Sequence, residues 1–365
     1  MLGALAQAGQ SLCCSNPNPR VGCVITDEDG KLLGQGATQK AGGAHAEIMA
    51  LRDAAERGHS VAHATAYVTL EPCSHHGRTG ACCDALIAAG IKKVVASSAD
   101  PTPLVSGQGF ERLRAAGIEV EVGPGAPESR ELNIGFFSRM IRKTPWLRMK
   151  IAASLDGKTA LNNGASQWIT SPPARADGHA WRARACAVLT GIGTVLADNP
   201  RLDVRLVDTP RQPHLVVLDS RLETPLNAHL FIATRTVYIY AATKNDIKKA
   251  ALEALGAIVV YLPGKEPGTE NKVDLAAMLQ DLARREINEL HVEAGHQLNG
   301  ALVGAGLVDE FVVYLAPKLI GQGRDMASFG PLSELPQAIP LEFIATDRLG
   351  PDLRIVARIA GRDQF

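Results

Sequence analysis

The alternation of short apolar runs with amphipathic stretches constrains the fold of this 365-residue chain more than any other feature. In the N-terminal part, an Asp27-Glu28-Asp29-Gly30 turn predicts a hairpin into a strand over 31–37. The other predicted strands there cover 21–26, 66–70, 93–97 and 118–122, and the predicted helices cover 2–8, 46–57, 83–89 and 109–116. Strands and helices that alternate in this way predict an α/β layer architecture.

A second series of strands and helices begins near Pro145, after a predicted helix over 128–142. The expected strands are 146–154, 187–190, 215–219, 237–241, 257–262, 290–293 and 311–316, and the expected helices are 173–185, 247–255, 275–286 and 298–305. This order is typical of a largely parallel or mixed sheet covered on both faces. Because the chain exceeds the size at which single cores usually stop growing, we expect two domains, 1–143 and 144–365.

The composition excludes several classes of partner. Lys plus Arg number 38 and Asp plus Glu number 38, so the chain lacks the overall positive charge that favours nucleic-acid binding. No stretch approaches the roughly 20 apolar residues that cross a bilayer. Seven cysteines, an odd number, without a signal-peptide pattern at the start indicate a reducing, cytoplasmic location. A homo-oligomer is expected from base rates alone.

Three candidate zinc ligands occur in the N-terminal half. His45 precedes a predicted helix, Cys73 follows Pro72 just after a predicted strand, and Cys82 opens another predicted helix. One His and two Cys leave the fourth tetrahedral position for water, which is typical of a catalytic zinc site. Glu47, two residues after His45, is the expected proton carrier that does not ligate the metal.

Two alternatives for this cluster remain open. His75 or His76 can replace one cysteine as a ligand. A purely structural zinc module would need a fourth protein ligand, and no convincing one accompanies the three. The other cysteines are expected to be small buried apolar residues, namely Cys13, Cys14, Cys23, Cys83 and Cys186.

The spacing of the cysteines identifies a family. His-x-Glu followed by Pro-Cys-x-x-Cys is the signature of zinc nucleobase deaminases, but here eight residues separate Cys73 from Cys82. The run 69–79 (TLEPCSHHGRT) with Cys82 beyond it closely resembles the deaminase half of the bifunctional riboflavin-biosynthesis deaminase/reductase, as do 16–24, 41–47 and 100–105. The resemblance implies a cytidine-deaminase-like three-layer domain. It also implies zinc on His45, Cys73 and Cys82 with Glu47 as proton shuttle, and pyrimidine or phosphate contacts from Asn18, His75 and Arg78.

This half departs from the family at two places. Gly80-Ala81 stands where the family usually has Pro-Pro, so the loop that delivers Cys82 loses a rigid turn. Thr38 stands where the family usually has His, which removes one expected substrate contact.

Glycine-containing strand ends mark the C-terminal half. It has no Gly-x-Gly-x-x-Gly after its first strand, but 190–194 and 293–300 place glycines where a backbone can approach a phosphate. The second segment runs into a predicted helix, whose first amides suit an anion. Plain turns are the alternative interpretation of both segments.

The segments 150–160, 166–170, 193–200 and 292–295 resemble the reductase half of the same bifunctional family, whose fold is similar to dihydrofolate reductase. The resemblance implies an NADPH site at Ala152, Trp168, Thr194, Asp198, Ser220, Gly295, His296, Gln297, Leu298 and Asn299. The implied substrate residues are Lys150, Ser166, Arg182, Leu202, Arg205 and Glu293, and the implied catalytic residue is Asp198. From the residues alone, Asp198 reads as a turn residue before Asn199-Pro200. His296-Gln297 stands where the family usually has Pro-Thr.

The resemblance implies two consecutive reactions of riboflavin biosynthesis. The first is hydrolytic deamination of 2,5-diamino-6-ribosylamino-4(3H)-pyrimidinone 5′-phosphate, and the second is NADPH-dependent reduction of its ribosyl group to ribityl. One alternative is a zinc deaminase for cytosine, a nucleoside or tRNA with a degenerate second half. Another is a nucleotide-binding regulatory or scaffold protein whose sites have decayed.

Overall fold

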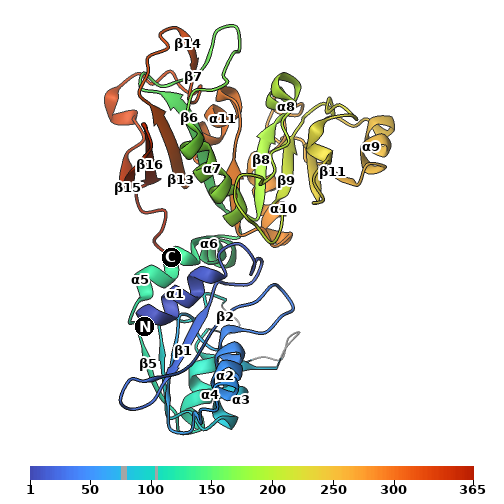
Figure 1. Ribbon diagram of the computed structural model, residues 1–365. Helices are drawn as coiled ribbons and strands as arrows, with labels where there is room; N and C mark the ends of the chain where they lie inside the picture. Colours follow the sequence, from blue (N-terminus) through green and yellow to red (C-terminus); the bar gives the residue numbers. More distant parts are fainter. Residues whose placement is uncertain (75–79, 103–105) are drawn as a thin grey trace. The chain divides into compact units, whose positions relative to one another are not determined.

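The structure is a computed structural model that describes residues 1–74, 80–102 and 106–365. Its chain divides into two compact units, Met1–Lys143 and Thr144–Phe365 (Figure 1). Both units are α/β, as the sequence predicts.

The first unit is built on a five-stranded sheet with the order β2-β1-β3-β4-β5 (Figure 1). β1 pairs antiparallel with β2 and β3, whereas β3, β4 and β5 are parallel. The strands are β1 (Gly22–Thr26), β2 (Leu32–Ala37), β3 (Thr65–Val68), β4 (Lys93–Ala96) and β5 (Glu119–Val122). The helices are α1 (Leu2–Gln10), α2 (Ala46–Glu56), α3 (Cys82–Ala88), α4 (Gln108–Ala115), α5 (Ala126–Leu132) and α6 (Ile134–Arg142).

Glycines let helices lie directly on both faces of this sheet. A Cβ on Gly36 of β2 would lie 2.5 Å from Met49 Cβ, so α2 approaches as closely as a glycine allows. A Cβ on Gly22 of β1 would clash with the backbone of Ala4 in α1. Gly36 pairs with Cys23, the neighbour of Gly22, so the two glycines point to opposite faces of the sheet. The unit is therefore the three-layer structure that the sequence predicts.

The second unit contains a nine-stranded sheet ordered β11-β10-β9-β8-β12-β6-β13-β16-β15. The first seven strands in this order are parallel, and β16 and β15 complete the sheet in antiparallel pairing. The strands are β6 (Trp146–Ser154), β8 (Ala187–Gly191), β9 (His214–Leu218), β10 (Val237–Ala241), β11 (Ala257–Tyr261), β12 (Glu289–Val292), β13 (Glu310–Ala316), β15 (Leu341–Leu349) and β16 (Asp352–Ile359).

Five helices accompany this sheet, and a separate pair of strands, β7 (Lys158–Leu161) and β14 (Gly323–Asp325), lies near the end of β6 (Figure 1). The helices are α7 (Pro172–Arg184), α8 (Ile192–Asp198), α9 (Asp246–Glu253), α10 (Leu275–Arg284) and α11 (His296–Gly304). Two single turns of 3-10 helix occur at His229–Phe231 and Leu335–Gln337.

The two faces of the nine-stranded sheet differ in polarity. On one face, Leu147, Met149 and Leu290 pack with α10 and α11 in the largest apolar cluster of the described chain. On the other face, under α7, the alternate strand positions carry charged side chains such as Arg148 and Glu289, both almost completely buried. This second face leads to the residues predicted to bind substrate.

The structure corrects three sequence predictions. The helix predicted over 128–142 is two helices that meet at Asn133, because the buried Asn133 side chain bonds the backbone N–H and C=O of Arg20. α8 occupies residues that were interpreted as a strand end and turn. The sequence does not predict the strands β7, β14, β15 and β16. In β15, Leu341–Ile344 are exposed, and Ala345 and Leu349 are only partly buried against the apolar cluster beneath, so the strand shows no run of buried alternate positions.

Candidate functional site

His45, Cys73 and Cys82 converge in the first unit. Their ligand atoms all lie within 4.8 Å of one another. His45 Nδ1 is 3.6 Å from Cys73 Sγ and 3.3 Å from Cys82 Sγ. The pKa of Cys73 is lowered, because Cys82 and His45 donate hydrogen bonds to its sulfur. Two sulfurs and one imidazole, with a thiolate favoured at one sulfur, suit zinc.

Three short contacts hold the Pro72–Cys73 segment against the start of α3. The backbone N–H of Cys82 donates to Cys73 Sγ over 3.3 Å, and the N–H of Cys83 donates to the Cys73 carbonyl over 3.2 Å. The buried Cys83 thiol donates to the Pro72 carbonyl over 3.1 Å. Cys83 is therefore a structural neighbour of the ligands, in agreement with its expected buried role.

Glu47 lies in the first turn of α2, two residues after His45, and is 3% exposed. Burial and, next, the neighbouring Cys73 raise its pKa to about 7, against a hydrogen bond from Cys82 that lowers it. It lies outside the three-residue metal cluster. A buried carboxyl group beside a metal site, with a pKa near neutrality, is suited to proton transfer.

Glu71 is a positioning residue that the sequence alone does not reveal, although it lies in the run 69–79 that carries Cys73. Its buried carboxylate accepts hydrogen bonds from the backbone N–H groups of Asp100, Gly107 and Gly109 over 2.8 to 3.0 Å. A Cβ on Gly109 would clash with the Pro72 carbonyl, so only glycine allows α4 to approach this closely. The start of α4 thereby supports the loop that carries Cys73. The sequence shows a Glu beside Pro72-Cys73, but neither its burial nor its backbone partners.

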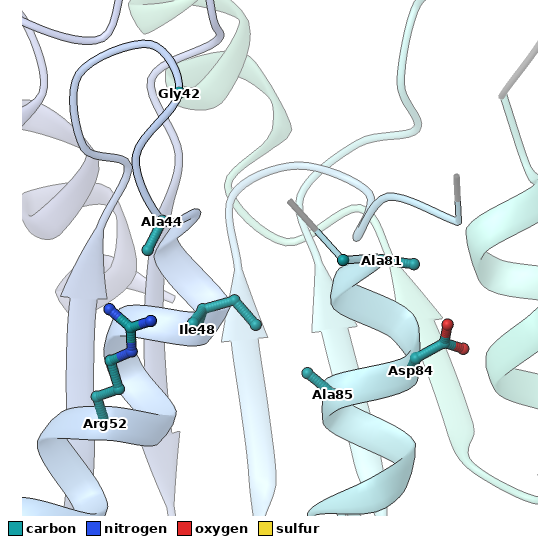
Figure 2. A pocket seen from close by; sticks show the side chains of 8 residues that line it. Gly42, Ala44, Ile48, Arg52, Ala81, Asp84 and Ala85 are labelled. Carbon is teal, nitrogen blue, oxygen red and sulfur yellow. The ribbon is translucent and has the colours of Figure 1, made fainter. Parts of the chain in front are cut away.

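A cavity of about 620 Å³ adjoins the ligand cluster between α2 and α3. Its lining includes Ala44, which precedes His45 before α2, and Ala81, which precedes Cys82 at the start of α3. Figure 2 shows Ile48 and Arg52 along one side of the cavity and Asp84 and Ala85 along the other. The ligands and Glu47 are absent from this lining, so the cavity lies beside the cluster.

The remaining residues predicted for the first unit are only partly described. Asn18 is half-buried, and its N–H donates to the Ser15 carbonyl over 2.9 Å. The Thr38 hydroxyl is buried and donates to the Val21 carbonyl over 3.4 Å, so this side chain is engaged with the β1 backbone. His75 and Arg78 lie outside the described residues.

In the second unit, β8 and β12 are parallel neighbours, so α8 and α11, which follow them directly, begin at the same edge of the sheet. A Cβ on Gly295 would lie 3.9 Å from Thr194 Oγ1, and one on Gly191 would lie 3.2 Å from Leu298. The two glycine-containing segments, 190–194 and 293–300, therefore lie close together at this edge of the sheet. Parallel α/β sheets bind ligands at such carboxyl ends.

The other predicted cofactor residues differ from one another in exposure and in contacts. Trp168 is 62% exposed and stacks on the Arg175 guanidinium at 4.5 Å. The buried Asn299 amide donates to the Met326 carbonyl, so its side chain faces the protein interior. Asp198 is the exposed last residue of α8. Ala152, Ser220, His296 and Leu298 are half-buried, and Gln297 is exposed.

Glu293 organises the predicted substrate residues. Its carboxylate accepts two hydrogen bonds from the Arg182 guanidinium, through Nε and, over 2.8 Å, through Nη2. Lys150 Nζ lies 3.7 Å away. Burial alone would raise the Glu293 pKa, but Arg182 and Lys150 hold it well below its usual range. Arg182 and Lys150 are therefore held together by one buried carboxylate.

The other predicted substrate residues surround this group less closely. Arg205 donates to the buried Asp203 carboxylate over 2.7 Å, and Arg182 Nη1 donates to the Asp203 carbonyl. Leu202 is buried with a positive φ of 51°, and its carbonyl accepts from Arg235. Ser166 is half-buried.

Comparison with known proteins finds one family model within each unit. Residues 1–98 match the family model of the cytidine and deoxycytidylate deaminase zinc-binding region, and residues 145–355 match that of the RibD C-terminal domain. The chain is 43% identical to riboflavin biosynthesis protein RibD of Escherichia coli over 97% of this chain and 96% of the relative. It is 41% identical to RibD of Aquifex aeolicus over 96% and 95%.

Solved structures have the same fold over nearly the whole chain. RibD of Acinetobacter baumannii superimposes with a TM-score of 0.86 at 39% identity, covering 97% of this chain and 96% of that one. The Thermotoga maritima diaminohydroxyphosphoribosylaminopyrimidine deaminase/5-amino-6-(5-phosphoribosylamino)uracil reductase also has a TM-score of 0.86, at 31% identity, covering 98% and 97%. Within the described residues, no helix is both long and apolar enough to span a membrane.

Proposed function

This chain belongs to the riboflavin biosynthesis RibD family, and on that basis we propose that its two units catalyse consecutive steps on one small-molecule pyrimidine. Residues 1–143 would deaminate 2,5-diamino-6-ribosylamino-4(3H)-pyrimidinone 5′-phosphate. Residues 144–365 would reduce the ribosyl group of the product to give 5-amino-6-ribitylamino-uracil 5′-phosphate. The observation that carries the proposal is the cluster of His45, Cys73 and Cys82 with Glu47 beside it.

In the deaminase unit, His45, Cys73 and Cys82 would hold zinc. When bound, zinc supplies a water made acidic enough to act as a nucleophile at neutral pH. The Glu47 carboxyl group takes a proton and returns it to the departing amine, so ammonia leaves as a neutral molecule. Asn18, His75 and Arg78 would contact the pyrimidine or its phosphate.

In the reductase unit, the edge formed by the starts of α8 and α11 would bind NADPH, which supplies the hydride for the sugar. Backbone N–H groups at the start of α11 favour a phosphate there. The proposed cofactor contacts are Ala152, Trp168, Thr194, Asp198, Ser220 and residues 295–299. The engaged Asn299 amide limits that residue to a backbone or packing role.

Lys150, Arg182 and Arg205 would bind the sugar phosphate, because they bring three cations to one region of the second unit. Ser166, Leu202 and Glu293 would complete the substrate contacts. Asp198 would orient the reacting sugar or give it a proton.

A cytoplasmic location and a homo-oligomer are parts of the same proposal. All seven cysteines are free thiols in the structure, which suits a reducing compartment.

β15 is an edge strand with Phe343 76% and Ile344 45% exposed, which suits contact with a second copy. Light scattering of the purified protein would measure the number of chains, and a monomer at micromolar concentration would contradict the oligomer.

The function is tested by mass spectrometry of the products formed by purified, zinc-loaded protein from the ribosylaminopyrimidine phosphate. We expect the deaminated pyrimidine without NADPH and its ribityl form with NADPH. Full occupancy by zinc without deaminated product would contradict the first activity. Deamination without reduction, in the presence of NADPH, would contradict the second.

A further inference from the structure

His291 is a buried imidazole that the proposed reduction does not use. It lies on β12 and is 0% exposed. Neither of its ring nitrogens has a hydrogen-bond partner among the described residues. Buried polar groups are nearly always paired, because an unpaired one destabilises the fold. Stability alone therefore does not explain a histidine at this position.

The free imidazole lies beside the carboxylate that organises the substrate residues. His291 Nε2 is 3.6 Å from Glu293 Oε1. Glu293 directly follows the last residue of β12, and its N–H still bonds the Leu189 carbonyl of β8, so it lies on the same face of the sheet as His291, two residues before it. The other charged groups around the ring are Arg148 and Lys150 from β6 and Arg182 from α7. Burial and these three cations lower the pKa of His291 to about 3, although Glu293 raises it, so the ring is neutral and carries one N–H.

At present Glu293 has other hydrogen-bond donors. Arg182 donates to both of its oxygens, and Lys150 Nζ is 3.7 Å away. These are two of the three cations assigned above to the substrate phosphate. A phosphate competes with Glu293 for both of them, and an ionised carboxylate that loses its donors inside a protein is strongly destabilised.

We propose that His291 is a positioning residue of the reductase site, which donates its Nε2–H to Glu293 when Arg182 and Lys150 turn toward the anionic substrate. This inference rests on the proposed function of the second unit. The required movement is small, because the present 3.6 Å need only shorten to about 2.8 Å, the usual length of a hydrogen bond to a charged acceptor. No proton is transferred, since a neutral donor meets an ionised acceptor.

The test is His291→Leu in the full-length, zinc-loaded protein. We expect the Kd for 5-amino-6-(5-phosphoribosylamino)uracil, measured by calorimetry, and the KM of the NADPH-dependent reduction both to rise about tenfold. The kcat should change less than KM, because the lost hydrogen bond supports binding in the ground and transition states alike. The melting temperature should stay the same or rise, because an unpaired polar group leaves the core.

Two further variants separate positioning from packing. His291→Gln places an amide N–H near the position of Nε2 and should bring Kd back to within about threefold of the wild type. His214→Leu makes the same substitution at the first residue of β9, where Nδ1 also lacks a partner among the described residues. It should leave Kd unchanged.

An unchanged Kd in His291→Leu would overturn the inference. Equal losses in the Leu and Gln variants, together with lower melting temperatures, would also overturn it, because they would indicate packing. A wild-type protein that binds the ligand without reducing it would contradict the proposed reduction, yet the Kd series would still decide the role of His291. A wild-type protein that does not bind the ligand would overturn both.

Discussion

The two candidate sites differ in how their residues are held. In the first unit, two helix starts and one strand end bring His45, Cys73 and Cys82 within 4.8 Å of one another. In the second unit, the charged side chains are spread over β6, β12 and α7 and hold one another through ion pairs such as Arg182 with Glu293. In the first site three side chains surround one position that suits a metal ion, whereas in the second site the charged side chains pair with one another.

This difference has an energetic consequence. Under α7, Arg148 pairs with Glu289 over 2.7 Å and with Glu310, and all three side chains are 1% exposed. Buried ion pairs recover the cost of leaving water only when their geometry is good, and removing one partner costs about 3–5 kcal/mol. We therefore expect substitution of one of these paired charges to lower the stability of the second unit, whereas Glu47→Gln in the first site should remove proton transfer alone.

The largest expected effect is that of Glu47→Gln on deamination. The variant should keep its zinc and lose about 10²–10⁴-fold in kcat, because only proton transfer is removed. Reduction of the deaminated substrate should be unchanged. Elemental analysis and separate assays of the two steps measure this. Cys82→Ser is the matched variant that should lose both zinc and deamination. Loss of zinc from Glu47→Gln would show that the carboxylate is a ligand.

A smaller effect is expected from Asp198→Ala in the second unit. Reduction should fall about 10²-fold and deamination should stay constant, because the role proposed for Asp198 concerns the sugar alone. Asp208→Ala, which alters another exposed carboxylate, is the control and should preserve both activities. If Asp198→Ala and Asp208→Ala behave alike, Asp198 is only the terminal residue of α8.

The first site could be predicted closely because its chemistry restricts both residue types and spacing. Cys and His are among the few residue types that bind zinc, and the positions of Pro72-Cys73 after a predicted strand and of Cys82 at a predicted helix start are visible in the sequence. The role of Glu71 could not be predicted, because its partners at residues 100, 107 and 109 are ordinary backbone N–H groups.

The second unit was harder to predict, for physical reasons. Glu289 and His291 of β12 and the following Glu293 occupy alternate positions, which taken alone is the pattern of a strand with one exposed face, although the order of the elements predicts a sheet covered on both faces. In the structure α7 covers that face, and the carboxylates find partners on distant strands, as Glu289 does with Arg148. The break at Asn133 likewise depends on Arg20, 113 residues away along the chain. Local patterns carry no signal for such pairings.

The pH dependence of stability should separate the two units further. Burial lowers the pKa of His291 to about 3 and that of His179 to about 4, so both are neutral in the native state at pH values where the unfolded chain is protonated. The unfolded state then binds more protons, and stability falls as the pH drops from about 6.5 toward 4, by about 1.4 kcal/mol per pH unit for each histidine. Glu293, whose pKa is lowered, adds a further loss below about 4.5.

This dependence can be measured by urea unfolding between pH 7.5 and 5.5, with hydrogen exchange of peptides from each unit. His291→Leu should remove about 1.4 kcal/mol, the share of one histidine, from the stability that is lost between pH 7.5 and 5.5. Equal slopes in the variant and the wild type would mean that His291 is protonated in the native state as readily as in the unfolded chain.

The smallest effect is expected at Gly80, where the family usually has proline. Among the described residues, a Cβ at Gly80 would meet no heavy atom within 4 Å, and its φ lies outside the left-handed region. Gly80→Ala should therefore stabilise the first unit by about 0.4–1 kcal/mol, by reducing the freedom of the unfolded chain. Gly30→Ala is the matched control: its site is equally open, but its φ of +81° is unfavourable for alanine, so it should destabilise. Calorimetry measures both melting temperatures. A rise in Gly80→Ala with a fall in Gly30→Ala would show that position 80 accepts a side chain. A fall in both variants would show that Gly80 is required as glycine.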